Sequence, residues 1–355
     1  MWIKCFSFLF LCVLMGAFPT RAQNNPPTQI FIEYHPEGDT LTFVNMVTGE
    51  QSSITVLGEK YLLLRDSILF QDRQTHEVNM MFADGDVMPH PFIQWGEDVR
   101  RIDWTVSDDR IAIAWTVTRG TPSALITETF VAQTDGTGQK SVLVDGPNDG
   151  FRAFPVGFDY GRQILYMDYQ PDFIGDSALY RQYASLFSIN IETQEIASLP
   201  GEAGCYCAGG VGAGHFVRLA LSQQGFDIAV YNLVAGTSDR IEAIGLNEYT
   251  QTGDLLITHD GTRAVYALSQ VRGFGTSEQT LQTVFVAVDL VNLTQQIITT
   301  PTSERLHPIL WTEDNSAILF TDAQRSGTWK LSLTDDGSLG EFVRIASMNY
   351  LGAFL

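Results

Sequence analysis

Aromatic and acidic residues gather in two stretches of this sequence that could bind a ligand. The stretches span residues 168–183 and residues 269–282. Aromatic rings beside carboxylates suit the binding of sugars, peptides or cationic groups, because the rings offer apolar faces and the carboxylates accept hydrogen bonds. The residues that we predict to contact a ligand are Asp168, Tyr169, Asp172, Phe173, Tyr180 and Phe274. The alternative interpretation is that the two stretches merely cover each other.

The carboxylates of the first stretch could also serve catalysis. Glycosidic bond cleavage needs two carboxylates at roughly 5–10 Å across a cleft, and Asp168, Asp172 and Asp176 could supply them. Acidic residues are abundant along the whole chain, however, with 41 in total. The sequence contains no Gly-x-Ser-x-Gly, His-Glu-x-x-His or Gly-Lys-Ser/Thr motif, and no sialidase-type Ser-x-Asp-x-Gly-x-x-Trp repeat. We therefore favour a non-catalytic binding or scaffold protein and keep a glycosidase or lyase as the alternative.

The cysteine, glycine and histidine patterns do not indicate a cofactor. Cys205 and Cys207 could form a strained disulfide, remain free thiols or make half of a metal site, but further zinc ligands at the usual spacing are absent. The glycine-rich run at residues 209–214 lacks the spacing of a dinucleotide loop and precedes a predicted strand. We interpret it as a crowded inner strand or entry loop. His90 has polar and aromatic neighbours, whereas His259 and His307 are predicted to lie at solvated turns. We predict no metal and no cofactor.

A degenerate motif recurs along the chain and predicts the elements that position these residues. It consists of an aromatic or polar lead, an acidic turn and an apolar strand, at residues 104–113, 158–166, 258–266 and 311–320. Asp, Asn and Gly favour tight turns, and the following Ile, Val, Phe and Tyr favour strands. Further turn markers recur about every 48 residues, close to the roughly 40–50 residues of a propeller blade. Alternating apolar residues, 31 Gly and 13 Pro indicate an all-β fold.

The motif resembles the TolB-like propeller repeats of bacteria, whose core reads Trp-Ser-Pro-Asp-Gly, two variable residues, then Ile-Ala-Phe. Residues 311–320 follow it most closely, with Thr, Glu and Asn replacing Ser, Pro and Gly. Residues 258–266 keep the Asp-Gly pair, and residues 104–113 keep the Trp and the strand. The resemblance covers most of residues 28–355. It implies a propeller fold and a cell-envelope or secreted setting, and it transfers no catalytic residue.

We predict one closed, seven-bladed β-propeller of four-stranded blades at residues 28–355, after a short tail at residues 23–27. Six or eight blades, and a β-sandwich, are the alternatives. The N-terminal part offers three strands, at 30–34, 41–47 and 52–57, and the last blade is followed by one more, at 350–355. We therefore expect the C-terminal strand to complete the N-terminal blade, which would leave only short strand edges. The other blades are expected at 60–97, 99–146, 151–200, 205–245, 247–300 and 306–346.

The first 22 residues read as a secretory signal peptide. Lys4 supplies the positive start, residues 6–18 the apolar stretch, and Thr20-Arg21-Ala22 a small-x-small cleavage site. The apolar stretch is too short to span a bilayer, which needs about 20 residues. We expect cleavage near Ala22 and a secreted or periplasmic protein without stable membrane insertion; a retained N-terminal anchor is the alternative.

The charge of the chain limits its partners. The formal net charge is −20, and loss of Lys4 and Arg21 with the signal peptide would make it more negative. Such a field repels nucleic acids. We expect a monomer that recognises a protein, peptide or carbohydrate. In a propeller, both aromatic and acidic stretches and the glycine-rich run should lie on one loop-rich face, because connections between second and third strands share a face with the links between blades.

Overall fold

The acidic motif forms the turn between the first and second strands of a blade. The Thr312 hydroxyl donates to Asp314 (2.7 Å) and accepts the amide of Ala317 (3.0 Å), while Asp314 accepts the amide of Ser316 (3.0 Å). Asn315 takes a left-handed conformation at φ 55°, which Asn tolerates well. The same hydroxyl–carboxylate turn occurs at Thr258 with Asp260 and at Ser107 with Asp109. The sequence motif is therefore a hydrogen-bonded turn that ends one strand and starts the next.

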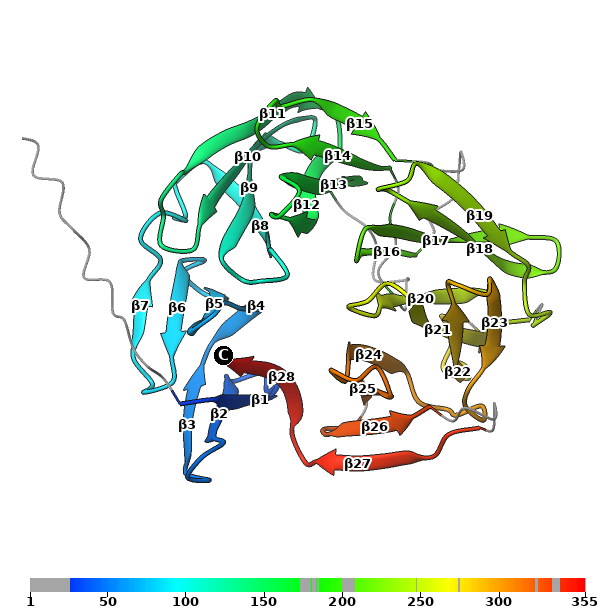
Figure 1. Cartoon of the computed structure of the whole chain (residues 1–355). Helices are drawn as coiled ribbons and strands as arrows, with labels where there is room; N and C mark the ends of the chain where they lie inside the picture. Colours follow the sequence, from blue (N-terminus) through cyan, green and yellow to red (C-terminus); the bar gives the residue numbers. More distant parts are fainter. Residues whose placement is uncertain are drawn as a thin grey trace, which may run out of the picture.

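The computed structural model describes residues 26–172, 180, 183, 185–199, 208–246, 248–273, 275–322, 325–333 and 339–354. These residues form 28 strands in seven antiparallel four-stranded sheets. Among them there is no helix that could cross a bilayer. Figure 1 shows the sheets arranged as the blades of a ring around a central channel. The predicted all-β, seven-bladed propeller is confirmed.

The blades follow one another along the chain, each with its first strand next to the channel and its fourth outside (Figure 1). Blade one contains β28 (Asn349–Phe354), β1 (Thr28–Glu33), β2 (Asp39–Asn45) and β3 (Gln51–Val56). Blade two contains β4 (Gly58–Leu63), β5 (Ser67–Asp72), β6 (Val78–Phe82) and β7 (Val87–Pro89). Blade three contains β8 (Val99–Val106), β9 (Ala112–Thr121), β10 (Ala124–Gln133) and β11 (Lys140–Asn148). Blade four contains β12 (Phe151–Asp159), β13 (Ile164–Pro171), β14 (Leu186–Asn190) and β15 (Ile196–Ser198).

The remaining three blades have the same order of strands. Blade five contains β16 (Gly209–Gly212), β17 (His215–Ser222), β18 (Gly225–Asn232) and β19 (Thr237–Ile241). Blade six contains β20 (Gln251–Ile257), β21 (Arg263–Arg272), β22 (Thr280–Asp289) and β23 (Thr294–Ile297). Blade seven contains β24 (Leu306–Trp311), β25 (Ala317–Asp322), β26 (Thr328–Ser332) and β27 (Phe342–Ala346).

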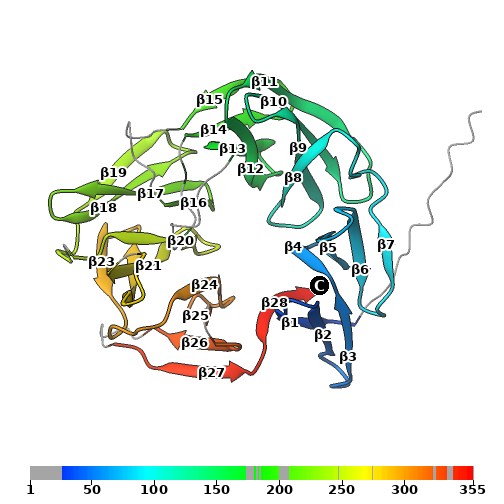
Figure 2. The same cartoon turned by 180° about the vertical axis from the view of Figure 1, so that it is seen from behind.

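The C-terminal strand closes the ring as predicted. β28 pairs antiparallel with β1, with Thr28 opposite Phe354 and Ile32 opposite Asn349. Both Figure 1 and the reverse view in Figure 2 show β28 beside β1 at the channel. Phe354 is almost fully buried. Closure therefore gives blade one its inner strand and removes an open sheet edge.

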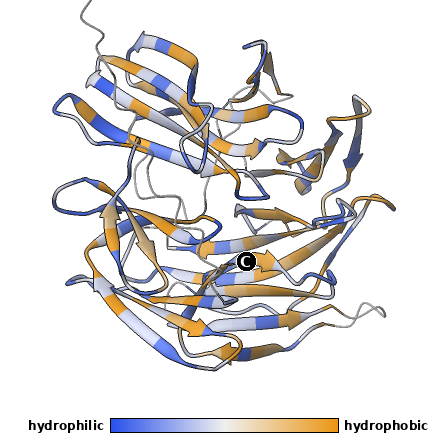
Figure 3. Cartoon of the chain, turned by 60° about the vertical axis from the view of Figure 1, so that its left-hand side comes forward, coloured by the Kyte–Doolittle hydropathy of each residue, from blue (hydrophilic) through white to orange (hydrophobic). Residues whose placement is uncertain are grey.

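The hydrophobic core lies between adjacent blades, so the central strands are buried on both faces. Val265 and Ala267 of β21 belong to the cluster shared with blade seven, whereas Ala264, Tyr266 and Leu268 belong to the cluster shared with blade five. This alternation follows from the two-residue period of a strand. Figure 3 shows hydrophobic residues concentrated on the strands.

One predicted connection is largely strand, and the glycine-rich run takes the first of its two interpretations, an inner strand. The stretch at 269–282 in blade six was expected to be a long connection, but β21 continues to Arg272 and β22 begins at Thr280. Pairing continues through Gln270 opposite Gln282 to Arg272 opposite Thr280, so the two strands form one long hairpin. The glycine-rich run forms the inner strand β16 at Gly209–Gly212, where a Cβ on Gly210 would lie 2.7 Å from the Leu255 carbonyl oxygen. Small residues are needed there because two inner strands approach closely.

Bulges in the inner strands direct side chains toward the following blade. Lys60 in β4 and Asp254 in β20 occupy corresponding positions, and both have φ 54° at a shift in register. The Lys60 ammonium donates to the Ile102 carbonyl oxygen at 2.8 Å, and Asp254 lies 2.5 Å from Nδ1 of His307. Ile102 and His307 belong to the first strands of the next blades. Bulges commonly re-aim side chains in this way next to functional sites.

Candidate functional site

The loop-rich face carries the connections between second and third strands and the links from one blade to the next. Asp168 and Tyr169 lie near this face but within β13, not on a loop. Asp168 is fully buried and accepts the Ser185 amide at 2.8 Å. Its carboxylate therefore fixes the start of the next strand, β14, and cannot touch a ligand in this arrangement.

Tyr169 packs between blades three and four. Its ring stacks on Phe187 with centroids 5.1 Å apart. Burial raises the pKa of its hydroxyl, as does a hydrogen bond with Asp145 from the outer strand of blade three. Tyr169 is partly buried and contributes to the hydrophobic cluster of these blades, so its main contacts are with the protein itself.

Tyr180 connects the blade-four stretch with blades six and seven. Its hydroxyl is 2.7 Å from Oγ of Ser269, which in turn is 2.7 Å from Oγ1 of Thr283. Its ring meets the His307 ring edge-on at 5.7 Å, and its side chain is buried in the cluster of these two blades. The two aromatic and acidic stretches thus meet on one face through Tyr180. Phe173, Asp176 and Phe274, like Cys205 and Cys207, lie outside the described residues.

Asp172 belongs to a group of charged side chains that we call the arginine cluster. The side chains of this cluster come from the first strands of blades two, three and four and from the end of β13. The members are Lys60, Arg100, Arg101, Asp103, Arg152 and Asp172. Each blade starts its first strand on the loop-rich face. The ring therefore brings together residues that are more than 100 positions apart in the chain.

Arg152 lies at the centre of the arginine cluster. Its side chain is only 4% exposed, and Nη1 is 2.5 Å from a carboxylate oxygen of Asp103. Arg101 donates from Nε to both oxygens of that carboxylate at 3.0 Å. Asp172 accepts from Arg100 at 3.2 Å and lies 3.4 Å from Nε of Arg152. The guanidinium of Arg152 also lies 4.9 Å from the centroid of the Phe154 ring.

Mutual electrostatics keep this cluster ionised. Burial would raise the pKa of Asp103, but Arg152, Arg101 and Lys60 outweigh it, so that pKa lies below its usual value. Burial lowers the pKa of Lys60, an effect that Asp103 only partly opposes. A buried charge is tolerated when partners surround it. The arrangement suits the binding of an anionic group and offers no free base or nucleophile.

Sequence reasoning identified Asp172 but missed the four cations. Lys60 and Arg101 are each the third residue of their blade's first strand, and Arg152 is the second. A comparison of the blades at their first strands would have placed all three on one ring around the channel. Inspection of loops alone could not, because these residues belong to strands.

A second polar group involves the histidine that the sequence placed at a solvated turn. His307 instead lies in β24, with Nδ1 2.5 Å from Asp254 and Nε2 accepting from Nε of Arg305 at 3.0 Å. In this pattern Nε2 accepts a hydrogen bond and Nδ1 faces the carboxylate. Both ring nitrogens are engaged within the protein, so the group resembles a structural link between blades six and seven more than a general base.

His90 is also a structural residue. It is 1% exposed, and its Nδ1 accepts the amide of Ile93 at 3.0 Å. Burial lowers its pKa to about 4. No group of three or more His, Cys, Asp or Glu side chains in the described part of the chain is arranged to hold a metal ion.

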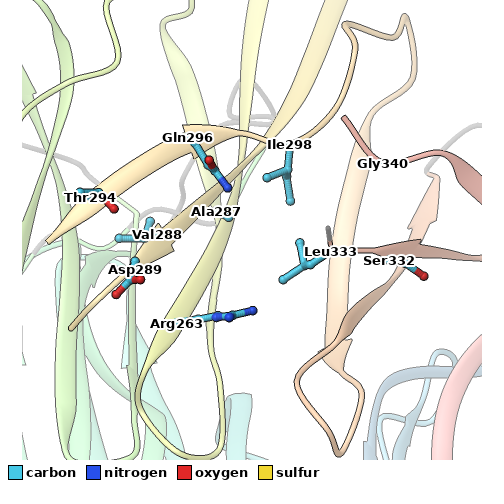
Figure 4. Close-up of a pocket in the computed structure, with 10 residues that line it drawn as sticks. All are labelled: Arg263, Ala287, Val288, Asp289, Thr294, Gln296, Ile298, Ser332, Leu333 and Gly340. Carbon is cyan, nitrogen blue, oxygen red and sulfur yellow. The ribbon is translucent and has the colours of Figure 1, made fainter. Parts of the chain in front are cut away.

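A cavity of about 260 Å³ lies between blades six and seven (Figure 4). Arg263 begins β21 and Asp289 ends β22, so the cavity opens toward the face opposite the loop-rich face. Asp289 already accepts the amides of Val291 and Asn292 in its own turn. The other lining residues are Ala287, Val288, Thr294, Gln296, Ile298, Ser332, Leu333 and Gly340. This polar hollow has fewer convergent charges than the arginine cluster.

Comparisons with known proteins show the fold and nothing finer. No protein-family model and no curated protein matches the chain. A solved oligogalacturonate lyase in complex with manganese is 11% identical, covering 88% of this chain and 85% of that one at a TM-score of 0.53. A prolyl endopeptidase structure is 8% identical with a TM-score of 0.62, covering 92% of this chain but 49% of that one.

The chain is also similar to TolB from Acinetobacter baumannii, with 10% identity, 92% and 81% coverage and a TM-score of 0.43. The resemblance to TolB-like repeats holds at the level of the fold, because the chain forms seven four-stranded propeller blades. At these identities the activities of the similar proteins do not transfer to this chain.

Proposed function

We propose that this chain is a secreted or periplasmic binding propeller that recognises a protein, peptide or carbohydrate without chemical conversion. The observation that carries this proposal is the arginine cluster on the loop-rich face. It joins the first strands of three blades in one ionic group, with Arg100 and Arg101 still 38% and 41% exposed. Partly exposed arginines on a rigid scaffold are frequent anchors of binding surfaces.

An exposed aromatic residue neighbours these charges along β12. Phe151, the residue before Arg152, is 47% exposed and pairs across the sheet with Pro171, the residue before Asp172. An aromatic ring fixes only two torsions on binding, so it costs little conformational entropy. Phe151 and Arg101 together supply the apolar and charged contacts that a ligand site needs.

The alternative is a glycosidase or lyase that uses carboxylates. It requires two carboxylates that reach a substrate. Asp168 is buried against the Ser185 amide and Asp172 is bound by arginines, which favours binding over catalysis.

Signal-peptide cleavage near Ala22 belongs to the same proposal and is tested by the N-terminal sequence of protein recovered outside the cytoplasm.

The deciding experiment screens the purified mature chain against glycan and peptide arrays and then assays each hit for turnover. A Phe151→Ala, Arg101→Gln double variant should weaken a hit by about tenfold or more, because hot-spot residues contribute roughly 2 kcal/mol. Val234→Ala is the matched control, since Val234 is 73% exposed in a turn on the opposite face. Equal loss in the control, or no loss in the double variant, would show that the face is wrong. Product formation would establish the enzyme alternative.

A further inference from the structure

The arginine cluster has an excess of positive charge within an acidic molecule. Its four cations, Lys60, Arg100, Arg101 and Arg152, share the carboxylates of Asp103 and Asp172. Glu59 also acts on Lys60, so the cluster keeps an excess of one positive charge. The chain as a whole carries a formal charge of −20. A local excess of the opposite sign is unexpected for a surface that serves solubility alone, and it creates a local preference for an anion.

Two of these cations have N–H groups that make no hydrogen bond within the described residues. Nε of Arg152 is buried and makes no hydrogen bond, although it lies 3.4 Å from Asp172. The Lys60 ammonium has three donors and makes one hydrogen bond within the described residues, to the Ile102 carbonyl oxygen. Asp103 is already shared by Arg101 and Arg152. These unused donors would favour the binding of an additional acceptor group at the cluster.

We infer that the arginine cluster is the recognition site for a single carboxylate of a small ligand whose body packs on Phe151. A carboxylate matches the planar fork of a guanidinium better than a spherical anion does. The negative field of the whole molecule repels polyanions, so the site suits one carboxylate rather than an acidic polymer. The ligand is either a sugar acid or a simple organic acid. This inference rests on the proposed function and names the chemistry of the same face.

Isothermal titration with glucuronate, glucose, propionate and sulfate tests the inference on the purified chain. We expect saturable binding of glucuronate or propionate and none of glucose. Arg101→Gln should weaken carboxylate binding about tenfold, the size expected for a hydrogen bond between charged groups. Arg240→Gln is the matched control, because Arg240 pairs with Asp227 at 2.8 Å on the outer strand of blade five. Equal melting temperatures of the two variants would show that folding is intact.

The pH dependence provides an independent readout. Since burial lowers the pKa of Lys60, its charge is lost at a lower pH than that of an exposed lysine. As the pH rises, the affinity of the wild type for a carboxylate should therefore decrease at a lower pH than the one at which exposed lysines lose their charge. The Lys60→Gln variant should bind more weakly and lack this decrease. A wild-type affinity that does not change over this range would contradict the role of Lys60 and overturn the inference.

The outcomes separate this inference from the proposed function. If the wild type binds glucuronate more tightly than propionate and Phe151→Ala loses this preference, the ligand is a sugar acid. If the wild type binds both equally, the ligand is a simple organic acid. Equal binding of sulfate, equal effects of Arg101→Gln and Arg240→Gln, or no carboxylate binding would overturn the inference, even if an array partner still binds the loop-rich face. Carboxylate binding without any array partner would support the inference and overturn the macromolecular partner.

Discussion

At the scale of single residues, burial decides which polar groups stabilise the fold and which remain available. Asp168 and His90 are both buried and both accept a backbone amide, from Ser185 and Ile93. Arg101 is also a polar side chain, but 41% of it is exposed. A buried acceptor without its donor would cost free energy, so the first two residues are structural. Arg101 keeps part of its side chain exposed and is therefore available to a ligand.

His90 should make the protein less stable in mild acid. Its pKa is about 4 in the folded chain and about 6.5 when unfolded. The unfolded chain therefore binds the extra proton between these values, and the free energy of unfolding falls by up to about 3 kcal/mol as the pH drops through this range. His90→Asn keeps an acceptor but cannot titrate. Urea unfolding of this variant should lose most of that pH dependence, whereas the exposed-site control His35→Asn should retain it.

At the scale of elements, the hydroxyl–carboxylate turns fix where strands begin and end. Asp260 and Asp314 each accept hydrogen bonds from a Thr hydroxyl and a backbone amide. These bonds lower the pKa of both carboxyls to about 2. The depressed pKa means that the turns contribute stability above the unfolded pKa of about 3.9, and this contribution is lost as the pH falls toward 2.

The double variant Asp260→Asn, Asp314→Asn should melt at a lower temperature than the wild type at neutral pH. Its melting temperature should also decrease less between about pH 4 and pH 2, because the titrating groups are gone. Scanning calorimetry at several pH values measures both effects. Asp84→Asn, in a turn that lacks the motif, serves as the comparison. Parallel wild-type and double-variant curves would contradict the assignment.

Tyr180 links elements that are distant in the chain. Replacement by Ala would remove a buried ring from the core of blades six and seven and should cost about 3–5 kcal/mol. Tyr180→Phe loses only the hydroxyl bonded to Ser269 and should cost about 1 kcal/mol. Chemical denaturation of the two variants distinguishes packing from hydrogen bonding. Equal stabilities of all three proteins would indicate that Tyr180 does not hold the blades together.

At the scale of the whole molecule, closure makes seven weakly similar blades one cooperative ring. Five hydrophobic clusters join blades one and two, two and three, three and four, five and six, and six and seven. β28 supplies the inner strand of blade one. Arg110, in the turn of blade three, strengthens the closure. Its guanidinium donates a hydrogen bond of 2.7 Å to the Ala353 carbonyl oxygen. The last strand therefore contacts more of the ring than its own blade.

Deletion of residues 349–355 should destabilise the entire protein. It removes the pairing with β1 and the buried Phe354, and it exposes a strand edge that promotes association. We expect a melting temperature lower by about 10 °C or more, given several kcal/mol lost, and a shift to larger species in size-exclusion chromatography. A flexible Gly-Ser extension of the same end is the control. An unchanged elution volume and melting temperature after truncation would contradict the role of closure.

The sequence by itself determined the architecture of this protein. The acidic motif marked the turns because Asp and hydroxyl side chains bond to the nearby backbone, a local interaction that the order of residues specifies. The repeat period gave the number of blades, and three strands at one end with one at the other predicted closure. Local periodicity is less informative about strand length, so the sequence predicts a connection at residues 269–282 where β21 and β22 continue.

Only the tertiary structure decided which side chains meet. Lys60, Arg101 and Arg152 come from three blades and converge because each blade places its first strand at the same channel. The bulge at Lys60 turns its side chain toward the next blade, and no residue pattern in one strand signals that direction. Tyr180 likewise reaches Ser269 across the ring. Strand periodicity is encoded locally, whereas contacts between blades depend on the angle and closure of the whole ring.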